Sequence, residues 1–225
     1  MDKKNIFDIM SKNWWNKRNI CQPLHIINNI RFNYIKSKTN LINKNILDLG
    51  CGGGILTEKL AKHGGKITAL DKSKELINIA KSRSNFLSLQ INYLNIDIIN
   101  FLKNCQTKFD VIICMELLEH LENKHHIIHL FKNILNKNGI IIISSLNKNI
   151  LTYIKIILFG EFILKKLHKN THIFNKLIKV YKMKNYETKL KIIDIKEIKY
   201  DPIFKYSKIN KIPEINYILT LKHVD

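Results

Sequence analysis

The chain has 225 residues, of which 45% are hydrophobic, with only 8 glycines and 3 prolines. This composition suits one globular domain spanning residues 1–225 and excludes a disordered or fibrous chain. The formal net charge of +20 would ordinarily point to nucleic acid or an anionic membrane. However, only Arg18, Arg31 and Arg83 are arginines, and the other basic residues are lysines. Because bidentate recognition of phosphate favours arginine, we expect no specific nucleic-acid partner.

The ends and apolar runs of the chain give no sign of export or of membrane insertion. The amino-terminal segment lacks the apolar stretch of a signal peptide. No apolar run reaches the roughly 20 residues that span a bilayer, and the longest, 154–167, is interrupted by charged residues. We therefore expect a protein of the bacterial cytoplasm whose contact with the inner membrane is at most peripheral.

Short strand-like runs alternate with helical runs between residues 45 and 145, which is typical of a parallel sheet built from βαβ units. The predicted strands are 45–50, 66–71, 91–94, 110–115 and 139–145, and the predicted helices are 56–63, 74–84 and 124–135. Two further β-rich runs, 189–200 and 215–222, are expected to pair antiparallel at one edge. The sequence therefore predicts an α/β fold with a doubly wound, mostly parallel seven-stranded sheet whose last strand is antiparallel.

Two segments lie outside this alternation. Residues 1–40 are expected to form an amino-terminal helical cap, and residues 151–185 a helical insertion that caps the substrate or contacts the membrane. Within the insertion, residues 151–169 combine a broad apolar face with lysines, a pattern suited to an anionic membrane surface. A buried helix covering the active site is the alternative.

The first predicted strand runs into a glycine-rich turn that contains Gly50, Gly52 and Gly54. The spacing is G-x-G-x-G, whereas a dinucleotide fingerprint needs G-x-G-x-x-G. The second predicted strand ends at Asp71, where a carboxylate can accept hydrogen bonds from both hydroxyls of a ribose. The pattern resembles the first motif of class I methyltransferases, which bind S-adenosylmethionine.

Polar residues also follow the fourth predicted strand. Met115 would lie at its carboxyl end and pack on the cofactor, unless it is an ordinary core methionine. If a helix follows, Glu116, Glu119 and His120 share one face and could hold a divalent metal. The alternative is a solvated helix start with acids stabilised by the helix dipole. If His120 is not a ligand, it is the best candidate for a general base.

Several motifs in a fixed order extend the resemblance over nearly the whole chain. Together they resemble the ubiquinone-biosynthesis O-methyltransferases of the 3-demethylubiquinol 3-O-methyltransferase type. They are WW at 14–15, PLH at 23–25 followed by INNIRFNY, then LDLGCGGGIL, CMELLEH, SSLNKN and KNTH at 169–172.

This resemblance implies a class I methyltransferase fold and O-methylation of polyprenylated phenol or quinol precursors of ubiquinone, at both O-methylation steps. It also implies an anionic membrane surface and other ubiquinone-biosynthesis proteins as partners. The site residues that it implies are Arg31, Gly50, Asp71 and Met115 for S-adenosylmethionine, with Arg31 at the carboxylate of the cofactor, and Glu116, Glu119 and His120 for Mg²⁺ or Zn²⁺.

Two other functions remain open on the sequence. A methyltransferase acting on nucleic acid is suggested by the charge, but the chain lacks the N-P-P-Y motif that amino-methylating enzymes carry after the fourth strand. A catalytically silent, membrane-binding relative that keeps the fold is the second alternative, and binding of S-adenosylmethionine would distinguish it.

Overall fold

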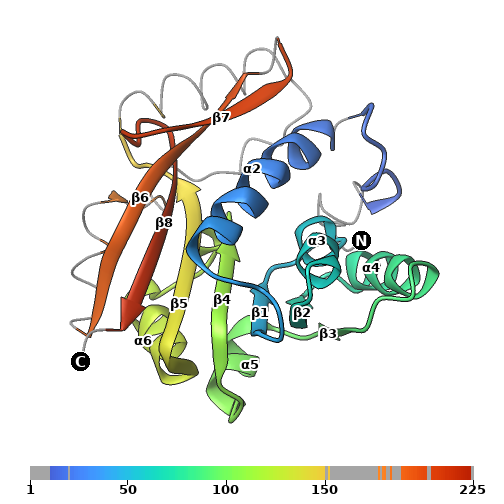
Figure 1. Cartoon of the computed structure of the whole chain (residues 1–225), viewed down its shortest axis with the longest axis horizontal. Helices are drawn as coiled ribbons and strands as arrows, with labels where there is room; N and C mark the ends of the chain where they lie inside the picture. Colours follow the sequence, from blue (N-terminus) through green and yellow to red (C-terminus); the bar gives the residue numbers. More distant parts are fainter. Residues whose placement is uncertain are drawn as a thin grey trace, which may run out of the picture.

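Eight strands form one sheet in the order β3-β2-β1-β4-β5-β8-β6-β7 (Figure 1). The computed structural model describes residues 11–19, 21–149, 152, 177, 179–180, 183, 189–201 and 204–223. The strands are β1 (Asn45–Leu49), β2 (Lys66–Asp71), β3 (Ile91–Asn95), β4 (Phe109–Met115), β5 (Leu135–Leu146), β6 (Leu190–Asp201), β7 (Tyr206–Asn210) and β8 (Asn216–His223). The helices are α2 (Gln22–Lys38), α3 (Ile55–Lys62), α4 (Lys74–Phe86), α5 (Ile98–Asn104) and α6 (Lys124–Asn133).

The first five strands are parallel, as the alternation of strands and helices predicts. The central strands β4 and β5 carry nearly continuous apolar runs, since both of their faces are covered by helices. β8 then pairs antiparallel with β5, and β6 pairs antiparallel with β8. The α/β class, the parallel sheet and the antiparallel edge are therefore confirmed.

The sheet has one strand more than the predicted seven. β7 pairs antiparallel with β6 at the edge, so two strands, β8 and β7, run against the parallel part, whereas β6 has the same direction as β5. Its sequence, YSKIN, shows no sustained apolar alternation, because an edge strand with largely exposed residues needs none. The short helix α5 was also not predicted, and the Asp97 carboxylate caps it by accepting hydrogen bonds from the backbone N–H groups of Ile99 and Asn100.

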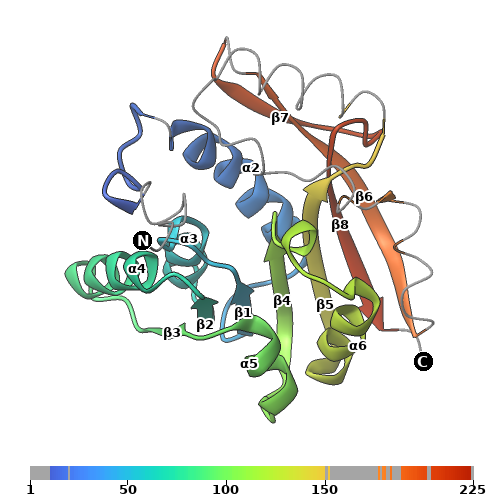
Figure 2. The same cartoon turned by 180° about the vertical axis from the view of Figure 1, so that it is seen from behind.

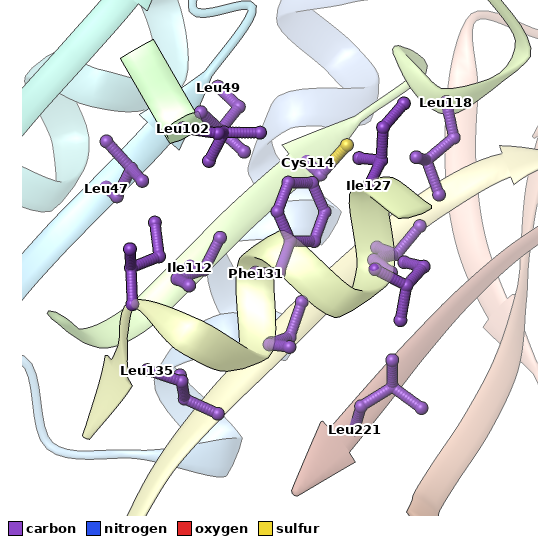
Figure 3. Close-up of a cluster of buried hydrophobic side chains, with 14 of the residues drawn as sticks. Leu47, Leu49, Leu102, Ile112, Cys114, Leu118, Ile127, Phe131, Leu135 and Leu221 are labelled. Atoms are coloured by element: carbon purple, nitrogen blue, oxygen red, sulfur yellow. The ribbon is translucent and has the colours of Figure 1, made fainter. Parts of the chain in front are cut away.

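Each face of the sheet carries its own apolar cluster. Along β4, successive side chains alternate between the two faces, so Ile112 and Cys114 belong to one cluster while Ile113 belongs to the other. The first cluster packs under α5 and α6, and Figure 3 shows Phe131 of α6 beside Cys114. The second packs under α2, α3 and α4. Helices thus cover both faces, as in a doubly wound sheet.

The amino-terminal helix α2 lies at the end of the sheet toward which β1, β4 and β5 point, as both views show (Figure 1, Figure 2). Tyr34 of α2 shares a 2.9 Å hydrogen bond with Thr220 of β8, and Lys38 forms a 2.6 Å ion pair with Asp194 of β6. The cap therefore joins the glycine-turn side of the sheet to its antiparallel edge.

The insertion predicted at 151–185 lies almost entirely outside the described residues. In the part of the chain that the structure describes, no helix is both long enough and apolar enough to cross a membrane.

Candidate cofactor and active site

The glycine turn after β1 is built from left-handed backbone. Gly50, Gly52 and Gly54 have φ values of 68°, 56° and 83°, a region that side chains disfavour. The N–H of Gly50 donates a 2.8 Å hydrogen bond to the carbonyl of Leu70 at the end of β2. The turn is therefore fixed against the neighbouring strand.

Asp71 lies beside this turn, as the sequence predicts. Its Oδ2 accepts a 3.0 Å hydrogen bond from the N–H of Gly52, and its Oδ1 accepts a 2.8 Å hydrogen bond from the N–H of Ser73. Two backbone donors thus orient the carboxylate at the carboxyl ends of β1 and β2. The structure brings the predicted cofactor residues Gly50, Gly52 and Asp71 together, and their role in binding stays a prediction.

A second carboxylate, that of Asp48, is buried in the strand that leads into the turn. Asp48 of β1 is buried, and its Oδ2 accepts a 2.6 Å hydrogen bond from Thr57 of α3. Burial raises the pKa of Asp48 to about 6, and the nearby charge of Asp71 acts in the same direction, whereas the Thr57 hydrogen bond lowers it. This contact ties α3 to the strand on which the glycine turn is mounted.

Arg31 and Glu116 meet at the carboxyl end of β4. Arg31 is buried on α2, and its Nη2 donates a 2.8 Å hydrogen bond to Oε1 of Glu116. Ser144 of β5 donates a second 2.8 Å hydrogen bond to the same oxygen. The Nε of Arg31 is buried and has no hydrogen-bond partner among the described residues. The Nε–H group of Arg31 is thus not used by the ion pair with Glu116. It could donate to the carboxylate of S-adenosylmethionine, the contact that the resemblance implies for Arg31.

Glu119, three residues after Glu116, is a buried acid. Its Oε2 accepts a 2.9 Å hydrogen bond from Ser145, while its Oε1 has no partner within the described part of the chain. Burial, and after it the charge of Glu116, raises the pKa of Glu119 to about 8. Glu119 therefore keeps its proton to higher pH than an ordinary carboxyl group does.

The helix that would place Glu116, Glu119 and His120 on one face does not follow Met115. Glu116 has a left-handed backbone, with φ of 51°, and only a short 3-10 helix, Leu118–His120, follows. His120 is exposed, whereas Glu119 is buried, so the three predicted ligands do not share one face. Among the described residues, no group of three His, Cys, Asp or Glu side chains is placed to hold a metal. Glu116, Glu119 and His120 do not fit a metal site in this arrangement, and we assign no chemical step to a metal.

Met115 lies where the sequence places it, at the carboxyl end of β4. It is half-buried and packs against the apolar cluster beneath α2 and α3. Its position agrees with both readings of the sequence, a cofactor contact and a core residue.

Two residues at the glycine turn were not predicted as site residues. The indole N–H of Trp15 donates a 2.9 Å hydrogen bond to the carbonyl of Gly53, and the ring of Trp14 packs on the same turn. The sequence did offer a signal for them. Both tryptophans of the chain stand next to each other in an otherwise polar segment.

Known proteins resemble this chain over nearly its whole length. A family model described as a methyltransferase domain matches residues 42–207. The ubiquinone biosynthesis O-methyltransferase of Glaesserella parasuis is 39% identical, with 96% of this chain and 95% of that protein covered. The Coxiella burnetii protein of the same name is 34% identical, with 99% and 97% covered. The chain belongs to the ubiquinone biosynthesis O-methyltransferase family.

Solved structures support the fold of this family member. Magnesium protoporphyrin IX methyltransferase from Synechocystis, with bound SAH (S-adenosylhomocysteine), superposes with a TM-score of 0.68 at 18% identity and covers 97% of this chain and 94% of its own. A methyltransferase from Clostridium acetobutylicum that depends on S-adenosylmethionine gives a TM-score of 0.66 at 16% identity, covering 98% and 100%. The expected class I methyltransferase fold is confirmed.

Proposed function

We propose that this chain transfers a methyl group from S-adenosylmethionine to a phenolic oxygen of polyprenylated ubiquinone precursors, at both O-methylation steps. The observation that carries the proposal is the 39% identity to a ubiquinone biosynthesis O-methyltransferase over nearly the full length of both chains. The glycine turn and the adjacent Asp71 support S-adenosylmethionine as the methyl donor.

Each predicted cofactor residue makes a different contact with S-adenosylmethionine. Gly50 and Gly52 let it approach the backbone, and Asp71 accepts hydrogen bonds from the ribose hydroxyls. The unpaired Nε of Arg31 donates to the carboxylate of the methionine arm. Met115 packs against the cofactor from the end of β4.

The reaction is an in-line displacement. The phenol oxygen attacks the methyl carbon, the carbon–sulfur bond breaks, and the sulfonium becomes the neutral thioether of S-adenosylhomocysteine, while the phenolic proton passes to a base. Holding both reactants in line can account for about 7 to 11 kcal/mol of the barrier.

His120 is our candidate for that base. Its imidazole is exposed at the carboxyl end of the sheet, and imidazole accepts protons near neutral pH. Glu119 is a weaker candidate, because burial raises its pKa and so favours its protonated form.

We also propose a peripheral contact with an anionic membrane surface, from which a lipid-soluble substrate would enter. The segment 151–169 that suggested this contact lies outside the described residues. The described chain offers a second apolar and basic surface, the β7 rim, formed by seven exposed residues around β7. They are Phe204, Lys205, Tyr206, Lys208, Ile209, Lys211 and Ile212. Each lysine near an anionic bilayer contributes roughly 1 kcal/mol.

An assay that offers the enzyme two classes of acceptor tests the proposal. Purified protein is incubated with methyl-labelled S-adenosylmethionine and either a short-chain demethylubiquinol analogue or total RNA. We expect label in the quinol and none in the RNA. Label in RNA alone would favour the nucleic-acid alternative, and binding of the cofactor without transfer to either acceptor would favour the catalytically silent one.

A further inference from the structure

Both tryptophans of the chain lie at the glycine turn, although neither belongs to the predicted cofactor residues. A Cβ atom on Gly52 would lie 2.6 Å from Cζ2 of Trp14, and one on Gly53 would lie 2.4 Å from its Cδ1. Only glycines therefore allow the indole ring to pack so closely on this turn. The absence of side chains at Gly52 and Gly53 thus admits the ring of Trp14.

The indole N–H of Trp14 has nothing to bond to in the structure as described. Trp14 is only 8% exposed, and its Nε1 is buried without a hydrogen-bond partner among the described residues. A buried donor without a partner costs stability, and such groups in folded proteins call for an explanation. A bound molecule that supplies an acceptor next to the turn would explain this one.

The neighbours of Trp14 hold it in place. Trp15 donates its indole N–H to the carbonyl of Gly53 at 2.9 Å, and the guanidinium of Arg83 lies 3.6 Å from the centre of its ring. Nε2 of His25 forms a 3.0 Å hydrogen bond with the backbone carbonyl of Trp14. The segment that carries Trp14 is thus attached to the turn, to α4 and to α2.

We propose that Trp14 is a cofactor-binding residue. Its ring forms one wall of the site above the Gly52–Gly53 backbone, and its N–H donates a hydrogen bond to an oxygen of bound S-adenosylmethionine. Trp15 is a positioning residue that acts through its bond to Gly53. This inference rests on the use of S-adenosylmethionine in the proposed function, and it adds a binding residue contributed by the amino-terminal cap.

Fluorescence tests the location of Trp14 directly, because the chain has no third tryptophan. In Trp15→Phe, Trp14 is the only indole, and in Trp14→Phe only Trp15 remains. We expect saturating S-adenosylhomocysteine to change the emission of Trp15→Phe clearly and that of Trp14→Phe much less. Unchanged emission from Trp15→Phe, with binding shown by calorimetry, would overturn the inference.

The hydrogen bond is tested by affinity. Trp14→Phe keeps an aromatic ring and removes the donor, so we expect binding of S-adenosylhomocysteine to weaken roughly fivefold, as for loss of one hydrogen bond. An affinity within twofold of the wild type, in a variant with an unchanged circular dichroism spectrum, would contradict this contact. Absence of binding to the wild type would count against the proposed function itself, so the two failures are distinguishable.

Discussion

Arg31 of α2 donates a 2.8 Å hydrogen bond to Glu116, which follows β4 and is 85 residues away in sequence. The pair joins the amino-terminal cap to the edge of the sheet where the strands end. Because Ser144 of β5 donates to the same carboxylate oxygen, three elements meet at one group. The contact holds α2 over the region where the cofactor and the substrate must come together.

We expect this ion pair to contribute to stability as a unit. Arg31→Met leaves a partly buried carboxylate without its cation and should lower the free energy of unfolding by about 3 kcal/mol, the lower end for breaking a buried pair. Glu116→Gln should cost a similar amount, and the double variant should cost less than the sum. A double-mutant cycle from urea denaturation measures this coupling, and additive losses would show that the two residues act independently.

Asp71→Ala should weaken binding of S-adenosylmethionine by about 1.5 to 3 kcal/mol, since its carboxylate is expected to bind the ribose hydroxyls. Calorimetric titration gives the affinity. Asp97→Ala is a matched control, because Asp97 also accepts hydrogen bonds from two backbone N–H groups but lies at the start of α5. Equal affinity in wild type and in a folded Asp71→Ala variant would remove Asp71 from the site.

The buried Asp48 makes stability depend on pH. Its pKa is about 6 in the folded protein and about 4 when unfolded, so the folded state binds the proton more tightly. Its contribution to stability is therefore complete below pH 4 and is lost as the pH rises through 6, a loss of about 2 to 3 kcal/mol at 1.4 kcal/mol per unit.

Unfolding free energies measured from pH 4 to pH 8 on wild type and Asp48→Asn isolate this effect as a difference. The variant should lack the decline. Thr57→Val removes the donor that favours the ionised carboxylate, so the decline should move to higher pH. Parallel curves for wild type and Asp48→Asn would contradict the assignment.

Most strands of the parallel part were predictable because they lie in the core and read as apolar runs between turns. β4 and β5 are the clearest cases. The edge strand β7 was not predictable, since its side chains are largely exposed and its five residues follow no apolar period. Local pattern therefore identified the core strands and also the edge strand β3, but missed β7 at the other edge.

The candidate site was predictable where it follows from strand ends. Gly52 and Asp71 lie side by side because Gly52 is in the turn after β1 and Asp71 ends the adjacent parallel strand β2. The geometry after Met115 was not predictable, because a helical spacing would place Glu116, Glu119 and His120 on one face, whereas the left-handed backbone of Glu116 is followed only by a short 3-10 helix. The contact of Trp14 with the turn joins residues about 40 positions apart, and no local pattern encodes it.

The β7 rim should bind anionic membranes. Vesicles containing phosphatidylglycerol should sediment the protein at low salt, neutral vesicles should do so poorly, and Phe204→Ser should reduce the salt-resistant fraction. Phe86→Ser is the matched control, because Phe86 is 84% exposed but lies at the end of α4. If the two variants bind vesicles equally, the membrane contact must be sought outside the rim.

The chemical identity of the product tests the account most directly. A short-chain demethylubiquinol analogue and S-adenosylmethionine are incubated with the wild-type enzyme, and the product is analysed by mass spectrometry and NMR. We predict that one phenolic oxygen of the quinol is converted into a methoxy group, and that S-adenosylhomocysteine forms in equal amount. A methyl group on carbon, or no methylated quinol from protein that binds the cofactor, would contradict it.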